Sequence, residues 1–558
     1  MFNSKQKKLF EVEKTETSVN DFIQAGLQKS AETVSGNGAL KYSTTGNSFV
    51  DQFGVIGSYK EPRSFEAISR DMSILWAESP KDAVAFALYL RMITRQVMLF
   101  NGKKTETTQR GAGVRHEAIM RFVWLAVNHE EAFWNNLHLL ISAGSWKDVI
   151  QMLSYDAQYH GWNGRVLDWE KITNVLLVGL ENPSHSDLIK KYLPQIKSNS
   201  KCKTVEAQAD NMIAKFIASK LFSNVEKQQR YVQYRKLKTS GQAHEWQQLI
   251  SQQKFSEIDF GSVHGRALSL LVSGDFLTKN GLEEKYDQWI SQIPVAKYTG
   301  YPHELFKGIT KGLKKFQVNT INKQFDGLVQ TAKKNAKTNT SMIVVRDTSG
   351  SMISTAPGTT QSCYDIAKAL ALFFTEMLPE GYFANNWIEF NSTAKMHTWK
   401  GSTPIEKWQN DRSGVIGSTN FQSVIDLFVQ IKKSGVGEEQ FPTGILCISD
   451  SEFNPTSDLK TTNVQMALQK LATVFSKEYV ENFKIVLWNL QSRYYDNNTG
   501  KKFETFGDVK NVFYFSGYDG SVVSFLTGTT DKAKSEPKTA QELLASALDQ
   551  ELLNMVRI

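Results

Sequence analysis

Small polar residues that could hold a metal ion follow a short apolar run near the middle of the chain. The run, residues 341–346, is β-branched and predicts a buried strand. Asp347-Thr348-Ser349-Gly350-Ser351 comes directly after it. In an open parallel α/β sheet, ligands bind just beyond the carboxyl ends of the strands. One carboxylate and two hydroxyls at alternate positions can face one site there, and such oxygen ligands suit Mg²⁺.

Two later segments extend this oxygen-rich group. Gly417-Ser418-Thr419-Asn420 ends a glycine-rich loop before a predicted helix at 421–433, and Asp450 follows a predicted strand at 443–449. A serine-rich turn alone is more often only a turn. Three groups in this order, each at a strand end or a helix start, match the metal-ion-dependent adhesion site of von Willebrand factor A (vWA) domains. The ligands predicted for one Mg²⁺ or Mn²⁺ ion are Asp347, Ser349, Ser351, Thr419 and Asp450.

Catalytic motifs are not found. His116-Glu117 and His244-Glu245 do not extend to the His-Glu-x-x-His pattern of zinc hydrolases. Neither a Gly-x-Ser-x-Gly elbow nor a Walker lysine motif occurs, and the serines of the metal motif have no neighbouring histidine base. We therefore expect a binding protein with no catalytic residues.

Basic residues form two candidate sites for RNA. The first surrounds Gly111-Ala112-Gly113, where backbone and guanidinium groups could approach phosphate; an ordinary helix–helix loop is an equal alternative. The second lies between residues 201 and 238 and mixes charged groups with tyrosines, as single-stranded RNA contacts require. The predicted RNA-binding residues are Lys103, Lys104, Arg110, Arg115, His116, Lys201, Lys203, Arg230, Arg235, Lys236 and Lys238.

The charge is divided unevenly between the two parts of this 558-residue chain. Residues 1–340 hold 45 Lys+Arg and 33 Asp+Glu, a net charge of +12, which leaves 65 − 45 = 20 basic and 57 − 33 = 24 acidic residues, −4, for residues 341–558. A basic first part predicts a polyanionic partner, although a solvated lysine-rich surface is the alternative. No secretory signal or membrane span is visible, and three scattered cysteines indicate a reducing cytoplasmic environment.

The periodicity predicts two different folds in sequence. Residues 1–62 are expected to be an arm of uncertain order. Residues 63–335 predict an all-α helical-repeat (HEAT-like) module, with a hinge at 333–337. Residues 336–558 predict a doubly wound, Rossmann-like α/β domain. The expected helices are at 82–98, 116–128, 131–143, 146–153, 169–180, 361–378 and 540–555, and further strands at 387–390, 394–399, 483–490 and 512–515.

The chain resembles the Ro autoantigen family, in which a TROVE helical-repeat domain precedes a vWA domain, and more closely a little-characterised plant and viral family of the same plan. The resemblance is carried by the metal motif and by Arg110–Arg115, Gly144–Asp148, Tyr234–Leu237, Glu257–Phe260, Pro302–Leu305, Ser449–Phe453 and Val486–Leu490. It implies a monomeric helical ring closed by the vWA domain, which binds single-stranded or structured small RNA as a ribonucleoprotein. The alternative is a protein–protein adaptor, or a viral structural or packaged component, whose metal site docks an acidic residue of its partner.

Overall fold

The computed structural model describes residues 32–558 apart from 35–36, 43, 61, 242–244, 264, 299, 310–311, 336–340, 379–382, 492–508 and 518–538. Helices make up most of the described chain up to residue 335, and a six-stranded sheet with flanking helices follows. The general plan predicted from the sequence, a helical module followed by an α/β domain, is confirmed. Part of the predicted hinge, residues 336–337, lies outside the described residues.

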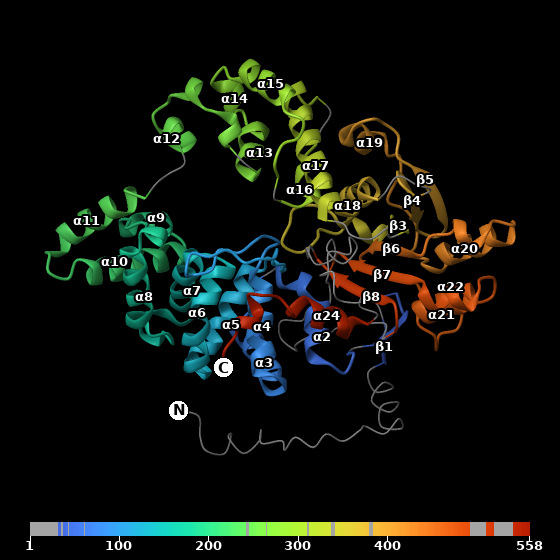
Figure 1. Cartoon of the computed structure of the whole chain (residues 1–558), viewed down its shortest axis with the longest axis horizontal. Coiled ribbons are helices and arrows are strands. Elements are labelled where there is room, and N and C mark those ends of the chain that lie inside the picture. The colour runs from blue at the N-terminus through green and yellow to red at the C-terminus, as the bar shows by residue number, and fades with distance from the viewer. Residues whose placement is uncertain are drawn as a thin grey trace.

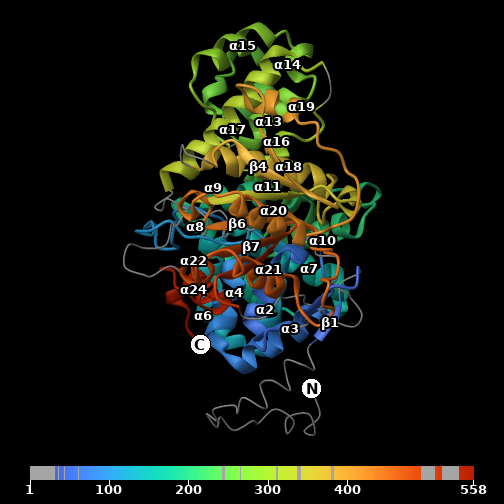
Figure 2. The same cartoon turned by 90° about the vertical axis from the view of Figure 1, so that its right-hand side faces the viewer.

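The helices of the first part form an arc (Figure 1). The longer ones are α3 (Phe65–Glu78), α4 (Pro80–Arg91), α5 (Arg115–Asn128), α6 (Glu130–Ala143), α7 (Trp146–Gly164), α8 (Trp169–Glu181), α9 (Pro183–Tyr192), α10 (Val205–Leu221), α11 (Lys227–Thr239), α13 (Gly265–Ser273), α15 (Glu283–Gln292) and α17 (Lys315–Asn335). Short helices α12 (Glu245–Ser251), α14 (Phe276–Lys279) and α16 (Pro302–Leu305) lie between them. In Figure 2, α13–α15 lie at the opposite end of the molecule from α3.

Local sequence signals explain where these helices begin. Ser64 and Ser79 accept hydrogen bonds from the backbone N–H groups three residues later, and Pro80 stands at the first position of α4. At the start of α7 the Asp148 carboxylate accepts a hydrogen bond from the backbone N–H of Ser145 (2.9 Å). Such caps satisfy N–H groups that have no partner inside the helix.

The sheet is parallel except at one edge. Its strands are β3 (Met342–Asp347), β4 (Asn386–Phe390), β5 (Ala394–Thr398), β6 (Gly444–Ser449), β7 (Lys484–Asn489) and β8 (Val512–Ser516), in the order β5-β4-β3-β6-β7-β8. Only β5 is antiparallel, through a hairpin with β4. The strands predicted from the apolar runs are confirmed. Because β3 is central and buried along its whole length, its first four residues, Met342–Val345, are apolar on both faces.

Helices cover both faces of the sheet. On one face, α18 (Cys363–Met377) packs on Val344, Leu446 and Val486 in the same hydrophobic core as the helical module. On the other, α20 (Gln422–Lys433) and α21 (Asn463–Leu471) cover Ile343 and Val345 in a second core. The short helices α19 (Pro404–Asn410) and α22 (Lys477–Asn482) complete the domain. One continuous core therefore joins α18 and its face of the sheet to the helical arc.

Segments near each end of the described chain contact elements of the other part: the first segments contact the sheet, and the last segments contact the helical module. Strands β1 (Glu32–Val34) and β2 (Leu40–Tyr42) pair, and α2 (Ser48–Gly54) and the 3-10 helix η2 (Ile56–Lys60) contact β8. Helix α24 (Ala540–Leu548) and the 3-10 helix η8 (Leu553–Met555) contact α4. Residues 48–60, grouped with an arm in the sequence analysis, are thus part of the main core. Phe49, Val50, Phe53, Ile56 and Tyr59 are buried there, in contrast to the arm of uncertain order that the sequence analysis expected.

Two predicted helices end earlier than expected. The one expected at 82–98 ends at Arg91, and the one expected at 540–555 ends at Leu548 and gives way to η8. In both places apolar residues continue past the helix, and some of them are buried: Met92 and Val97 after α4, and Leu552 and Leu553 after α24. No helix among the described residues is long and apolar enough to cross a membrane.

Candidate functional site

Asp347 is the last residue of β3 and is completely buried at the carboxyl end of the sheet. The parallel register pairs Arg346 with Ile448, so Ser449 and Asp450 lie at the same edge as Asp347. The Ser449 hydroxyl donates a hydrogen bond to Asp347 Oδ2 (2.5 Å), and the backbone N–H of Ser349 donates to Oδ1 (2.8 Å). These bonds fix the orientation of the carboxylate.

The two serines of the motif lie side by side after Asp347. Their Oγ atoms are 3.1 Å apart, at the start of the 3-10 helix η6 (Gly350–Ile353). Ser349 is buried, whereas Ser351 is partly exposed. The alternate spacing thus brings both hydroxyls together, as the sequence predicted.

The loop that carries Thr419 packs directly against the loop that follows β3. The backbone N–H of Ile416 donates to the carbonyl of Thr348 (3.0 Å), and that of Gly350 donates to the carbonyl of Gly417 (3.2 Å). Thr419 is buried and is held by Asn454, whose backbone N–H donates to the Thr419 carbonyl (2.9 Å). Three segments far apart in the sequence therefore meet at one edge of the sheet.

The electrostatics of this edge favour a bound cation. Burial, and next the neighbouring Asp450, raise the pKa of Asp347 from its ordinary value of 3.8 to about 7, although hydrogen bonds from Ser449 and Ser349 oppose the shift. Ser451 has a positive φ of 63°, and its buried Oγ has no hydrogen-bond partner within the described structure. Two adjacent carboxylates and several hydroxyls form a donor set that fits a small divalent cation.

The described part of the chain offers no metal site made of histidine, cysteine and carboxylate side chains alone. It contains no group of three or more His, Cys, Asp or Glu side chains arranged to hold a metal ion. Cys202, Cys363 and Cys447 are buried and form no disulfide with one another. A metal at the sheet edge would therefore depend on hydroxyl oxygens and water as well as on Asp347 and Asp450.

A segment near the start of the described chain supports the loop after β6. The Lys41 ammonium group donates to the carbonyl of Ser451 (2.8 Å), and the Asn37 side chain donates to that of Glu452 (2.5 Å). Lys41 is almost completely buried. More than 400 residues separate these partners, and no sequence pattern connects them.

The glycine turn between α4 and α5 does not present its N–H groups to a ligand. Those of Ala112, Gly113 and Val114 donate to the carbonyls of Tyr89, Met92 and Leu90, and so cap the end of α4. Gly111 lies so close to α4 that an added Cβ would come within 2.4 Å of the Tyr89 carbonyl. These contacts are the ones expected of the helix–helix loop that the sequence analysis kept as an alternative, and the glycines allow the close packing.

Among the predicted RNA-binding lysines and arginines, Arg115, Arg230 and Lys238 make internal polar contacts through their side chains. Arg115 forms an ion pair with the buried Asp148 (3.1 Å). Arg230 donates to the carbonyls of Val225 and Ser223, and Lys238 donates to those of Lys191 and Leu193. These contacts stabilise the module itself.

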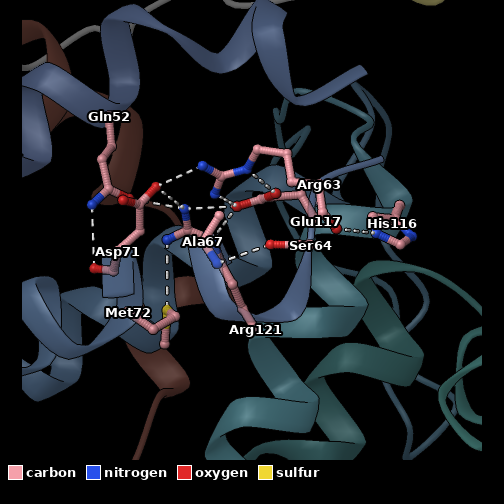
Figure 3. Close-up of polar contacts among 9 residues, drawn as sticks. All are labelled: Gln52, Arg63, Ser64, Ala67, Asp71, Met72, His116, Glu117 and Arg121. Carbon is pink, nitrogen blue, oxygen red and sulfur yellow. Dashed lines mark hydrogen bonds and ion pairs between the residues drawn. The ribbon is translucent and has the colours of Figure 1, made fainter. Parts of the chain in front are cut away.

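His116 lies beside a buried charge network (Figure 3). Its Nε2 is 3.4 Å from the Arg63 carbonyl, and burial lowers its pKa. Arg63 and Arg121 both contact the carboxylate of Glu117, and Arg63 also pairs with Asp71 (2.9 Å). Burial alone would raise the pKa of Glu117, but the two guanidinium groups outweigh it and hold this pKa below its ordinary value. This network links α3 to α5.

Most of the other predicted RNA-binding residues are exposed. Lys103 and Lys104 lie at the tip of a hairpin-like segment between α4 and α5, in which Arg95 bridges Gln109 and Met98 bridges Lys104. The remaining exposed members are Lys201, Lys203, Arg235 and Lys236. Arg110 is partly buried, and its backbone N–H and carbonyl both bond the side chain of Gln550.

Helix α9 connects the two basic segments. At its start, His185 stacks on Phe100 of the hairpin, with ring centres 5.0 Å apart. At its end, Leu193 and Pro194 accept hydrogen bonds from Lys238 and from Tyr234 of α11. Ten helical residues span about 15 Å, which sets the scale of the separation between the two segments.

Comparison with known proteins finds a matching family model for the carboxyl-terminal part of the chain. Residues 341–552 match the family model of a domain of unknown function, DUF7788. No curated protein matches the chain. The crystal structure of the Deinococcus radiodurans Ro (RSR) protein is similar over 74% of this chain and 88% of that one, with 13% sequence identity and a TM-score of 0.34.

The DUF7788 match includes the five predicted metal ligands and also side chains that the sequence analysis missed. Ser449 and Asn454, which hold Asp347 and Thr419, are both within it. Ser449 immediately precedes Asp450, so its place at the strand end was a usable signal. Lys190 and Lys191, in the last turn of α9, were missed in the basic module, although paired lysines at a helix end were visible in the sequence.

Proposed function

We propose that this protein binds single-stranded or structured small RNA through its basic helical module, which is of the HEAT-like, TROVE type. The observation that supports this best is the presence of exposed basic residues in the two segments that flank α9. Lys103 and Lys104 extend from one segment and Arg235 and Lys236 from the other. An RNA strand that follows α9 would reach both.

A salt titration tests this proposal. Binding of fluorescently labelled single-stranded RNA is measured over a series of salt concentrations. Neutralising several phosphates should give a steep negative slope of log affinity against log salt, about 0.7 per contact. Alanine at Lys103, Lys104, Arg235 and Lys236 should weaken binding to all sequences similarly and reduce the slope by about 3.

The matched control removes the same charge elsewhere. Lys395, Lys400, Lys433 and Lys460 are exposed in the α/β domain, and their alanine variant should keep the affinity and the slope of the original chain. A flat slope for the unmodified chain, or equal losses in the two variants, would contradict RNA binding through the α9 region.

We further propose that the α/β domain is of the vWA type and holds Mg²⁺ or Mn²⁺ at Asp347, Ser349, Ser351, Thr419 and Asp450. The ion would neutralise the two buried carboxylates and offer a coordination position to a ligand. Calorimetric titration with either metal should show binding, and Asp347→Ala should abolish it while circular dichroism shows an intact fold. Equal binding by both proteins, or none by the original chain at millimolar metal, would exclude the site.

A further inference from the structure

A segment that follows α24 is bonded to the hairpin that carries Lys103 and Lys104. The hairpin is closed by Arg95 and Gln109, whose backbone N–H and carbonyl groups bond each other (2.9 and 2.8 Å). Helix α24 packs on α4 and also contacts β8 (Figure 1). The segment after it, residues 549–557, is here called the strap. The strap thus extends from the α/β part of the chain to a hairpin of the helical module.

Gln550 of the strap bonds both polar backbone groups of Arg110, the residue that directly follows the hairpin. Its Oε1 accepts a hydrogen bond from the Arg110 N–H (2.6 Å), and its Nε2 donates to the Arg110 carbonyl (3.0 Å). Leu552 donates its backbone N–H to Oε1 of the buried Gln109 (3.0 Å). The base of the hairpin is therefore fixed by the strap.

Glu551 bonds the returning arm of the hairpin, two residues after Lys104. Its Oε2 accepts hydrogen bonds from the backbone N–H groups of Glu106 (2.8 Å) and Thr107 (3.4 Å). A hydrogen bond in which the acceptor is ionised is roughly twice as strong as one between neutral groups. Glu551 therefore holds the arm that leads out of the basic tip.

The strap itself is anchored in the helical module. Leu552, Leu553 and Val556 are buried in the main core. Near the end of the strap, the buried side chain of Asn136 in α6 accepts from the Arg557 N–H (3.0 Å) and donates to the Arg557 carbonyl (2.5 Å). Apolar burial and these hydrogen bonds make the strap a fixed support for the hairpin.

The tip of the hairpin is attached separately to α9. Besides the ring stacking described above, Nε2 of His185 lies 3.2 Å from the Phe100 carbonyl. The side chains of Lys103 and Lys104 are exposed beyond this attachment. The hairpin is thus held near its tip by α9 and at its base by the strap.

We propose that the strap positions the hairpin for RNA: Gln550 and Glu551 hold it where Lys103 and Lys104 contact phosphate. The RNA role rests on the function proposed above, whereas the holding of the hairpin rests on the hydrogen bonds alone. Without these bonds the hairpin would have to be ordered when RNA binds. Ordering even one backbone residue lowers an affinity about fivefold.

Hydrogen exchange of the full-length protein tests the holding of the hairpin without RNA. The strap variant is Gln550→Ala/Glu551→Ala. In it, the backbone N–H groups of Glu106, Thr107 and Arg110 should exchange at least about tenfold faster than in the original chain. The reason is that each of these groups loses the side-chain oxygen that accepts its hydrogen bond.

Asn554→Ala/Met555→Ala is the matched control. It changes two exposed residues of the strap and leaves the contacts with the hairpin in place, so its exchange rates should equal those of the original chain. Unchanged rates in the strap variant, or equal acceleration in the two variants, would overturn the proposal whatever the RNA result.

A double-mutant cycle tests the RNA role. The effect of the strap variant on the affinity for labelled single-stranded RNA is measured in the original chain and in Lys103→Ala/Lys104→Ala. If the strap acts by positioning these two lysines, binding should weaken about fivefold in the first background and stay unchanged in the second. A general loss of stability would weaken binding equally in both backgrounds, and that result would refute a positioning role.

The two measurements separate this inference from the proposed function. Faster exchange together with the expected cycle supports both. If the original chain binds RNA but either the exchange or the cycle gives the opposite result, the role of the strap is excluded and RNA binding is retained. If the original chain binds no RNA while exchange is accelerated, RNA binding is excluded, and the RNA role of the strap is excluded with it.

Discussion

Asp347→Asn should stabilise the metal-free protein at neutral pH. Asp347 is completely buried beside Asp450, and the raised pKa shows that its ionised form is disfavoured in the folded state. Asparagine has nearly the same shape. Its Oδ1 can still accept from the Ser349 N–H, and its amide can donate to the Ser449 hydroxyl, which is able to accept as well as donate.

The magnitude follows from the pKa difference between the folded and unfolded states. Well below pH 3.8 the carboxyl is protonated in both states, so it does not affect stability. Between 3.8 and about 7 the unfolded chain ionises first, and stability is lost as the pH rises. Above pH 7 the full cost applies, about 4 kcal/mol for a shift of roughly three pKa units. Because asparagine does not ionise, Asp347→Asn avoids this cost.

The assay is urea denaturation of both proteins in EDTA at pH 5, 6, 7 and 8. The advantage of Asp347→Asn should grow with pH up to about 4 kcal/mol, and millimolar Mg²⁺ should stabilise only the original chain.

Asp411→Asn is the control of opposite sign. Burial would raise the pKa of Asp411, but Arg346 and Lys368 lower it, so its ionised form stabilises the fold at neutral pH and that stability is lost on acidification. This variant should be less stable than the original chain at pH 7. Parallel pH profiles for the original chain and Asp347→Asn would refute the reasoning about buried carboxylates.

Three further predictions concern contacts between distant parts of the chain. Glu117→Gln leaves Arg63 and Arg121 without their shared carboxylate and should cost about 3–5 kcal/mol in urea denaturation. Gly57→Ala places a Cβ 2.2 Å from the Gly517 backbone nitrogen and should lower stability by about 1–3 kcal/mol, whereas the same change at the open Gly414 should have little effect in the same assay. Deletion of residues 552–558 removes three buried apolar side chains from the helical module and should lower the thermal midpoint and speed proteolysis; an unchanged cleavage rate would contradict this.

The strands and the composition of the candidate metal site could be predicted from local patterns. A buried parallel strand is a short β-branched run, and polar residues that follow such runs must meet at one edge of the sheet. That geometry is enough to bring Asp347 and Asp450 together from positions about a hundred residues apart. It does not identify Ser449 as the donor to Asp347, because that depends on the register between β3 and β6.

The roles of the basic residues could not be read from the sequence. Arg115 and Arg235 have the same charge, yet Arg115 pairs with Asp148 while Arg235 is exposed on α11. Both the residues and their spacing are compatible with phosphate contacts. Only the packing of the surrounding helices determines whether an arginine meets a buried carboxylate or solvent.

What the sequence by itself determined is the order of the elements, the division into a basic helical part and an α/β part, and the oxygen-bearing residues at the strand ends. What only the tertiary structure decided is which surfaces meet and which stay exposed: Lys41 lies against Ser451 and α24 against α4, while Ile353, Ile416 and Leu459 remain exposed. The physical reason is that periodicity and capping are local properties of a few neighbouring residues. Burial depends on every element that packs nearby, including segments more than 400 residues away.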